Sequence, residues 1–104
     1  MLCAAGFGEL AGIDQAQLAL MVSEREVLAF AAGTGGLRLP LWQVCPDGSL
    51  LPRLSTLFRF LDDDPWVVYR FLTGPHPDFS WNAPLSTLRA GCTAPVLVAA
   101  RAFA

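Results

Sequence analysis

The sequence contains no lysine, and its seven basic residues are all arginine. Charged residues make up only 15% of the chain, and acidic side chains outnumber basic ones, which gives a formal net charge of −2. Proteins that hold nucleic acid by general electrostatic attraction are usually basic. The overall charge balance therefore does not indicate a nucleic-acid-binding protein.

The chain also lacks paired cysteines and long apolar runs. Its three cysteines, Cys3, Cys45 and Cys92, lie far apart, so the sequence encodes neither a zinc knuckle nor a Cys-x-x-Cys redox pair. The N-terminal stretch "MLCAAGFGEL" has no basic region, and no run of eighteen apolar residues is present, which argues against a secretory signal and a membrane span. We expect free thiols in a cytoplasmic protein.

No recognised catalytic pattern is present. None of the serines sits in a Gly-x-Ser-x-Gly elbow, and "GTGG" at 33–36 is not followed by the Lys-Ser or Lys-Thr of a phosphate loop. The only histidine, His76, lies between two prolines and is expected to be a surface loop residue. The acidic triplet 62–64 could attract a divalent cation, but its spacing has no EF-hand pattern and helix capping explains all three aspartates. We predict no catalytic residue, no metal site and no cofactor; a small stand-alone enzyme is the weakest alternative.

Apolar residues, in contrast, are abundant. They make up 54% of 104 residues, which is more than one small core readily hides. The composition therefore predicts an exposed apolar patch that is covered by a partner protein or a second copy of the chain, most simply a homodimer. The alternative is a monomer with an unusually rich core.

The N-terminal third reads as two short helices joined by a tight turn. The first spans residues 7–12 and is ended by Gly12, and the second spans residues 15–26 and is capped by Asp14. This order is the outline of a helix-turn-helix. One face of the second helix carries Leu18, Met21, Val22 and Arg25.

A hairpin is predicted behind these helices. The β-favouring run 27–30, the turn "GTGG" and the alternating "LRLPLWQV" at 37–44 supply two strands and a connection. Pro40 lacks a backbone donor, so its strand should lie at a sheet edge. The segment "CPDGSLLP" supplies a second turn. A helix-turn-helix with a hairpin behind it is typical of a winged helix.

The rest of the chain is predicted to be helical. A helix over 53–61 places Leu54, Leu57, Phe58 and Leu61 on one face. A second helix begins at Pro65, after three aspartates that cap it. A third helix, over 85–90, stops at Gly91, and Thr93 caps the last helix. The predicted fold class is mainly α with a small β-hairpin. Residues 1–36 form a helix-turn-helix-like segment leading into the hairpin, and residues 37–104 form a second segment that ends in a small helical bundle. The two segments are expected to make one compact unit overall.

Local charge weighs against DNA binding by the helix-turn-helix. Residues 1–36 contain four acidic residues against Arg25 alone, a balance of −3. The base-reading side chains on the second helix are Gln15 and Gln17, with Arg25 as the one cation. We expect the motif to serve mainly packing or dimerisation, and we keep a DNA-binding regulator as the alternative.

Aromatic residues gather between residues 42 and 81. They are suited either to a core or to the hot spots of a protein interface with arginines at its rim. The aromatic set is Trp42, Phe58, Phe60, Trp66, Tyr69, Phe71, Phe79 and Trp81, and the arginines are Arg53, Arg59, Arg70 and Arg89.

The segments "LRLPLWQVCPDGSLLPRL", "DPWVVYRFL" and "NAPLSTLRAG" followed by "VLVAARA" resemble, in this order, the toxin-binding domain of the MbcA/ParS/Xre antitoxin family. The resemblance covers about residues 37–104. The matching positions are Arg38, Pro40, Trp42, Gln43, Asp47, Gly48, Pro52, Asp64, Trp66, Phe71, Leu72, Pro75, Pro84, Leu85, Leu88, Arg89, Gly91, Val96, Ala99 and Ala100.

The resemblance implies a function in protein–protein contact. Members of this family neutralise a cognate toxin, typically a RES-domain protein that depletes NAD⁺, often assemble as dimers, and repress their own operon when a DNA-binding half is present. By this likeness Arg89, Arg101 and Phe103 are the expected partner-binding residues. The alternative is a winged-helix transcriptional regulator that acts on DNA.

Overall fold

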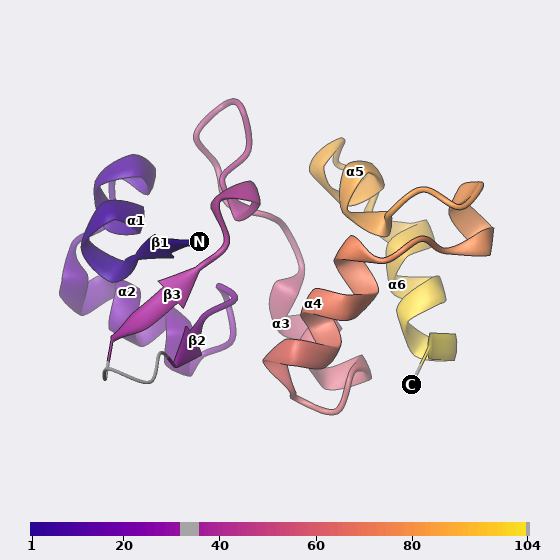
Figure 1. Cartoon of the computed structure of the whole chain (residues 1–104), viewed down its shortest axis with the longest axis horizontal. Helices are drawn as coiled ribbons and strands as arrows, with labels where there is room; N and C mark the ends of the chain where they lie inside the picture. The colour runs from indigo at the N-terminus through magenta and orange to yellow at the C-terminus, as the bar shows by residue number, and fades with distance from the viewer. Residues whose placement is uncertain (32–35, 104) are drawn as a thin grey trace. The chain divides into compact units, whose positions relative to one another are not determined.

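The computed structural model describes residues 1–31 and 36–103 of the chain (Figure 1). It is mainly helical, with a small antiparallel sheet near the N-terminus, which confirms the predicted fold class. The chain divides into two compact units, Met1–Leu51 and Pro52–Ala104. Among the helices of the described residues, none is long and apolar enough to cross a membrane.

The N-terminal unit combines two helices with three short strands. Its elements are β1 (Leu2–Cys3), α1 (Ala4–Ala11), α2 (Gln15–Ser23), β2 (Phe30–Ala31), β3 (Leu37–Leu39) and a 3-10 helix, η1 (Leu41–Gln43). The strand order is β1-β3-β2, and both pairings are antiparallel. Phe30 lies opposite Arg38 in the predicted hairpin, and Leu2 lies opposite Leu39 in a pairing that the sequence analysis did not predict. The predicted turn at 33–35 lies outside the described residues.

Two predictions for this region are wrong. Pro40 does not lie on an edge strand, because β3 is the central strand and ends at Leu39, just before the proline. Without a backbone N–H, Pro40 cannot extend the ladder, and the chain turns into η1. The predicted boundary between residues 36 and 37 is also wrong, because β3 pairs with β1 and β2. The boundary lies after Leu51.

The core of the N-terminal unit combines buried apolar side chains with one buried amide. Phe7, Leu18, Val27 and Leu39 form the buried cluster. Gln43 is completely buried and bonds twice to the backbone of Leu28. Its Oε1 accepts the Leu28 N–H at 2.6 Å, and its Nε2 donates to the Leu28 carbonyl at 2.7 Å. The Gln43 amide therefore satisfies both backbone polar groups of Leu28, as a neighbouring strand would.

The C-terminal unit is built from four helices: α3 (Leu54–Phe60), α4 (Pro65–Thr73), α5 (Pro84–Arg89) and α6 (Thr93–Phe103), with a 3-10 turn, η2 (Pro77–Phe79). Helix α6 packs against α3 and α5, and α4 packs against α3 and α5. The predicted inner face of α3 is confirmed, since Leu54, Leu57, Phe58 and Leu61 are all buried.

Only one of the three clustered aspartates is a helix cap. Asp64 precedes Pro65 and its Oδ1 accepts the N–H of Trp66 at 2.9 Å. Asp62 and Asp63 instead adopt left-handed backbone conformations, with φ of 62° and 53°, and form the turn between α3 and α4. The prediction that all three cap the helix is therefore wrong for the first two.

His76 is not the surface loop residue that its neighbouring prolines indicated. Its side chain is only 16% exposed, and its ring lies edge-on to Phe71 and Phe79, with centroid distances of 6.0 and 5.6 Å. Its Nδ1 accepts the backbone N–H of Asp78 at 3.1 Å and so caps η2. The role of the ring is to hold the loop between α4 and α5.

Candidate nucleic-acid interface

Hydrogen bonds fix the turn between α1 and α2, and they depend on a glycine at its start and a capping aspartate at its end. Gly12 ends α1 in the left-handed region at φ 71°, and its N–H bonds to the Gly8 carbonyl. The N–H of Ile13 donates to the same carbonyl at 2.8 Å. Asp14 then starts α2, and its Oδ1 accepts the N–H of Gln17 at 2.7 Å. The predicted glycine stop and aspartate cap are both confirmed.

Gly8 lets the turn lie directly against α1. A Cβ at this position would stand 2.7 Å from the Ile13 carbonyl oxygen and 2.8 Å from Nε2 of Gln15. That Nε2 donates to the Ala4 carbonyl at 3.1 Å, which ties the start of α2 to α1. Gln15, predicted as a base-reading residue, therefore has its amide engaged within the motif.

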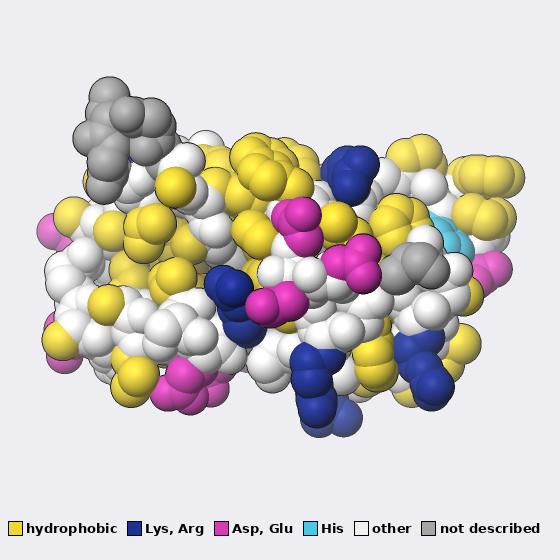
Figure 2. Space-filling model, turned by 90° about the horizontal axis from the view of Figure 1, so that it is seen from below, with side chains coloured by type: hydrophobic (Ala, Val, Ile, Leu, Met, Phe, Trp, Pro, Cys, Tyr) yellow, Lys and Arg dark blue, Asp and Glu magenta, His cyan; other side chains and the backbone are white. Residues whose placement is uncertain are grey.

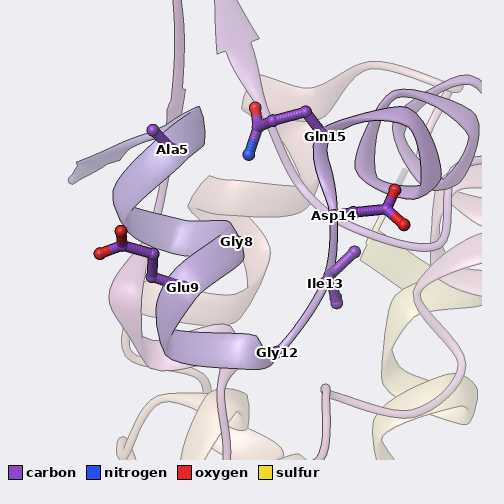
Figure 3. Close-up of a pocket in the computed structure, with 7 residues that line it drawn as sticks. All are labelled: Ala5, Gly8, Glu9, Gly12, Ile13, Asp14 and Gln15. Carbon is purple, nitrogen blue, oxygen red and sulfur yellow. The ribbon is translucent and has the colours of Figure 1, made fainter.

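A shallow pocket lies along this turn (Figure 3). Its walls include the backbone of Gly8 and Gly12 and the side chain of Ile13. Figure 3 shows the carboxylates of Glu9 and Asp14 pointing to opposite sides of the motif and not toward one another. The pocket therefore holds no converging pair of titratable groups.

The outward face of α2 carries no charge. Leu18 is buried, and Met21 and Val22 pack against the core, which fixes the orientation of the helix. Leu20 is 57% exposed, a large exposed fraction for a leucine side chain. The exposed positions are Gln15, Ala16, Gln17, Ala19, Leu20 and Ser23.

Arg25 does not lie on α2 as predicted. The helix ends at Ser23, and Arg25 follows it in a left-handed conformation with φ 63°. Gln17, the remaining predicted base reader, is exposed in the first turn of α2. The other arginine of the unit, Arg38, is exposed on β3, next to the described end of the hairpin. The N-terminal unit holds two arginines and five acidic residues, a net charge of −3.

The predicted partner-binding residues lie on two helices of the C-terminal unit. Arg101 places its guanidinium carbon 5.6 Å from the centre of the Phe60 ring. Phe103 contacts Phe71 edge-on at 5.3 Å and stays 45% exposed. These two residues share the last turn of α6, whereas Arg89 is exposed at the end of α5.

The aromatic set divides into core and surface residues. Phe58 and Phe71 are buried, whereas Trp66 and Trp81 are 54% and 68% exposed. Val98, on α6, is also 68% exposed. Figure 2 shows hydrophobic side chains at many points of the surface that it draws. The composition predicted such exposure, but only the packing of each helix decides which apolar residues remain outside.

The N-terminal unit, with two helices, a three-residue turn and a β-hairpin behind them, has the arrangement of a winged helix-turn-helix. No model of a known protein family matches the chain, and no curated protein matches it. The chain is similar to the NMR structure of Rv2175c, with a TM-score of 0.80 and 23% sequence identity. The similarity covers 97% of this chain and 78% of that one. At this level of identity the likeness shows a shared fold.

Proposed function

We propose that the chain is a DNA-binding regulator of the winged helix-turn-helix class, in which α2 enters the major groove. The observation that carries the proposal is the outward face of α2. It follows a glycine turn, and the inner face of α2 is held on the core. Its outer face exposes small side chains, Leu20 and the amide of Gln17. A helix inserted into the major groove needs a narrow, exposed face of this kind.

The chemistry of that face favours A·T base pairs. The amide of Gln17 has the donor and acceptor that pair with the N6 and N7 edge of adenine. The methyl groups of Ala16 and Ala19 suit the C5 methyl of thymine. The face carries no arginine or lysine to pair with guanine. We therefore infer a preference for an A·T-rich half-site.

The charge of the unit sets the conditions for measuring this binding. With a net charge of −3, the N-terminal unit gains little from general attraction to phosphate. Binding should then depend on base contacts and be measured at low salt. Leu18, Met21 and Val22 already pack α2 on the core through its inner face, so the outward face of the helix is available for base contacts and is not needed for packing.

The test is a fluorescence-anisotropy titration of the whole chain on a duplex from its own promoter at low salt. Gln17→Ala removes the adenine contact and should weaken specific binding about 5- to 150-fold, which corresponds to about 1–3 kcal/mol per bidentate pair. Ala19→Glu, which places a carboxylate in the groove-facing position, should abolish binding. Ser55→Glu adds the same charge on α3 as the matched control. Retention of full affinity by Ala19→Glu would reject the proposal.

A second candidate is an antitoxin-like function, in which the C-terminal unit binds and neutralises a RES-type, NAD⁺-depleting toxin. The exposure of Trp81 and Val98 supports it, because large apolar side chains more than half exposed are typical of interfaces. Arg89, Arg101 and Phe103 would form the polar and aromatic part of that contact. A homodimer and repression of the chain's own operon belong to the same proposal.

Co-expression with the toxin encoded beside the gene tests this second candidate. Relief of toxicity and a recovered complex would support it, and Val98→Asp should break the complex if α6 makes the contact. Ser55→Asp, an equally charged change at an exposed position of α3, is the control. If toxicity persists and no complex is recovered, the antitoxin proposal fails.

A further inference from the structure

The loop between α4 and α5 is closed by backbone hydrogen bonds of His76. The carbonyl of His76 accepts the N–H groups of Phe79 and Trp81, both at 3.0 Å. The N–H of His76 donates to the carbonyl of Asn82 at 3.2 Å. These bonds join the two ends of the segment 76–82 and give it a compact, closed form.

Two residues of this loop adopt a backbone conformation that costs free energy. Ser80 and Trp81 follow one another in the left-handed region, with φ of 55° and 65°. Residues with a Cβ seldom adopt this conformation, and bulky ones least of all. Trp81 is also 68% exposed, so burial of its ring does not offset the cost. Such a conformation persists only while neighbouring contacts hold it, and the loss of one contact favours a relaxed loop.

The imidazole of His76 supplies one of these contacts, and it can do so only in its neutral form. Its Nδ1 accepts the backbone N–H of Asp78 at 3.1 Å, which places the proton of the neutral ring on Nε2. A protonated imidazole carries hydrogen on both nitrogens and accepts no bond. Oδ2 of the same Asp78 lies 3.9 Å from Nδ1 and can accept from the protonated ring. A proton taken up from solvent thus exchanges a backbone hydrogen bond for an ion pair.

The other neighbours of the ring are apolar. Phe71 of α4 and Phe79 of η2 lie edge-on to it, and neither titrates. Arg70, next to Phe71 in the chain, is exposed, and Arg101 of α6 lies over Phe60. The titratable groups on the elements of this part of the fold are Asp78 on η2, Tyr69 and Arg70 on α4, Arg89 on α5 and Arg101 on α6.

We propose that His76 is a pH-sensitive switch for the segment 76–82. With the ring neutral, Nδ1 caps η2 and the loop presents Trp81 in its strained conformation. With the ring protonated, it turns from the Asp78 N–H to the Asp78 carboxylate, and the strained segment relaxes. Histidine is the side chain that changes its charge between about pH 5 and pH 8, and a 16% exposed ring can exchange protons with solvent. The switch requires neither DNA binding nor toxin binding, but any contact made by Trp81 would be weaker in acid.

A pH titration of the whole chain by heteronuclear NMR tests the switch without a ligand. The ring C–H resonances of His76 report its charge, and the exchange protection factor of the Asp78 amide reports the backbone bond. From about pH 8 to about pH 5 this factor should fall about 2- to 12-fold, the ratio that corresponds to about 0.5–1.5 kcal/mol for one hydrogen bond. The heteronuclear NOE of Ser80 and Trp81 should fall with it, because a relaxed backbone moves faster. A constant protection factor while the ring titrates, or a ring still neutral at about pH 5, overturns the proposal.

Two variants identify the groups involved. His76→Asn keeps an acceptor at the start of η2 that does not titrate, so the Asp78 amide should be equally protected at both pH values. Asp78→Asn keeps the backbone N–H but removes the charge, so it should match the wild type with the ring neutral and lose more order with the ring protonated. If His76→Asn shows the wild-type fall, another group titrates and the switch is rejected. If Asp78→Asn matches the wild type at both pH values, the exchange to the carboxylate is rejected. The wild-type titration decides the matter even if a variant unfolds.

Discussion

Replacement of Gly8 by alanine tests the geometry of the helix-turn-helix most sharply. The added Cβ would stand 2.7 Å from the Ile13 carbonyl oxygen, closer than real Cβ atoms come to such an atom. The turn must then move away from α1, which weakens the Ile13 N–H bond to Gly8 and the Gln15 amide bond to Ala4. Two weakened hydrogen bonds cost about 1 kcal/mol each, and overpacking adds about 1–3 kcal/mol.

A gain in helix propensity offsets part of this cost. Alanine is better than glycine inside a helix by about 1 kcal/mol, so the net destabilisation by Gly8→Ala should be about 2–4 kcal/mol. The matched control is Gly6→Ala in the same helix. There the new Cβ would lie 3.5 Å from Sγ of Cys3, an ordinary contact, and the backbone N–H that donates to this sulfur is retained. Gly6→Ala should therefore stabilise the unit by about 0.5–1 kcal/mol.

Urea denaturation followed by far-ultraviolet circular dichroism measures both variants. The two midpoints should move in opposite directions, and Gly8→Ala should also weaken promoter binding because the start of α2 is displaced. If Gly8→Ala is as stable as Gly6→Ala, the turn does not approach α1 closely in the protein, and Gly8 does not set the position of α2.

Three further predictions concern polar side chains that hold local structure. Gln43→Leu leaves the buried N–H and carbonyl of Leu28 without partners and should lower the unfolding free energy by about 2–5 kcal/mol, measured by denaturant titration; an unchanged midpoint contradicts the role of the amide. Asp64→Ala removes the cap of α4 and should cost about 0.5–2 kcal/mol, and a loss of less than a few tenths would show that the cap is dispensable. Hydrogen bonds from the hydroxyl and the backbone N–H of Ser49 lower the pKa of the Asp47 carboxyl. The contribution of these bonds to folding stability is therefore present above the ordinary pKa of aspartate and is lost as the pH falls through the lowered pKa. Ser49→Ala should raise the pKa of Asp47 in a carboxyl NMR titration, and an unchanged pKa would refute the assignment.

The local parts of the fold were predictable from the sequence. Gly12 and Asp14 specify where α1 ends and α2 begins through bonds to residues three or four positions away. The inner face of α3 follows from helical periodicity alone. Such signals depend on neighbours in the chain, so they survive in the folded protein.

The features that sequence reasoning missed depend on distant partners. Leu2 and Cys3 form a strand only because β3 lies beside them, and this pairing also moves the boundary between the units to residue 51. His76 is partly buried because Phe71, on α4, reaches the loop that follows it. No periodic pattern in the sequence indicates either contact.

The candidate site was predicted in part. The helix-turn-helix was found, but the engagement of Gln15 with Ala4 and the displacement of Arg25 from α2 required the three-dimensional contacts. The exposure of Leu20 and Val98 was likewise not predictable, because α2 and α6 carry apolar residues on both their inner and outer faces. The composition predicts surplus apolar residues, but the packing of each helix decides which of them face outward.

A heteronuclear NMR titration of the whole chain with promoter duplex at low salt is the sharpest test of DNA reading by α2. If α2 enters the major groove, the backbone amides of Gln17, Ala19 and Leu20 should shift and saturate together, and a duplex with G·C pairs at the recognised positions should produce much smaller shifts. Amides of α2 that stay unmoved at saturating duplex would contradict it.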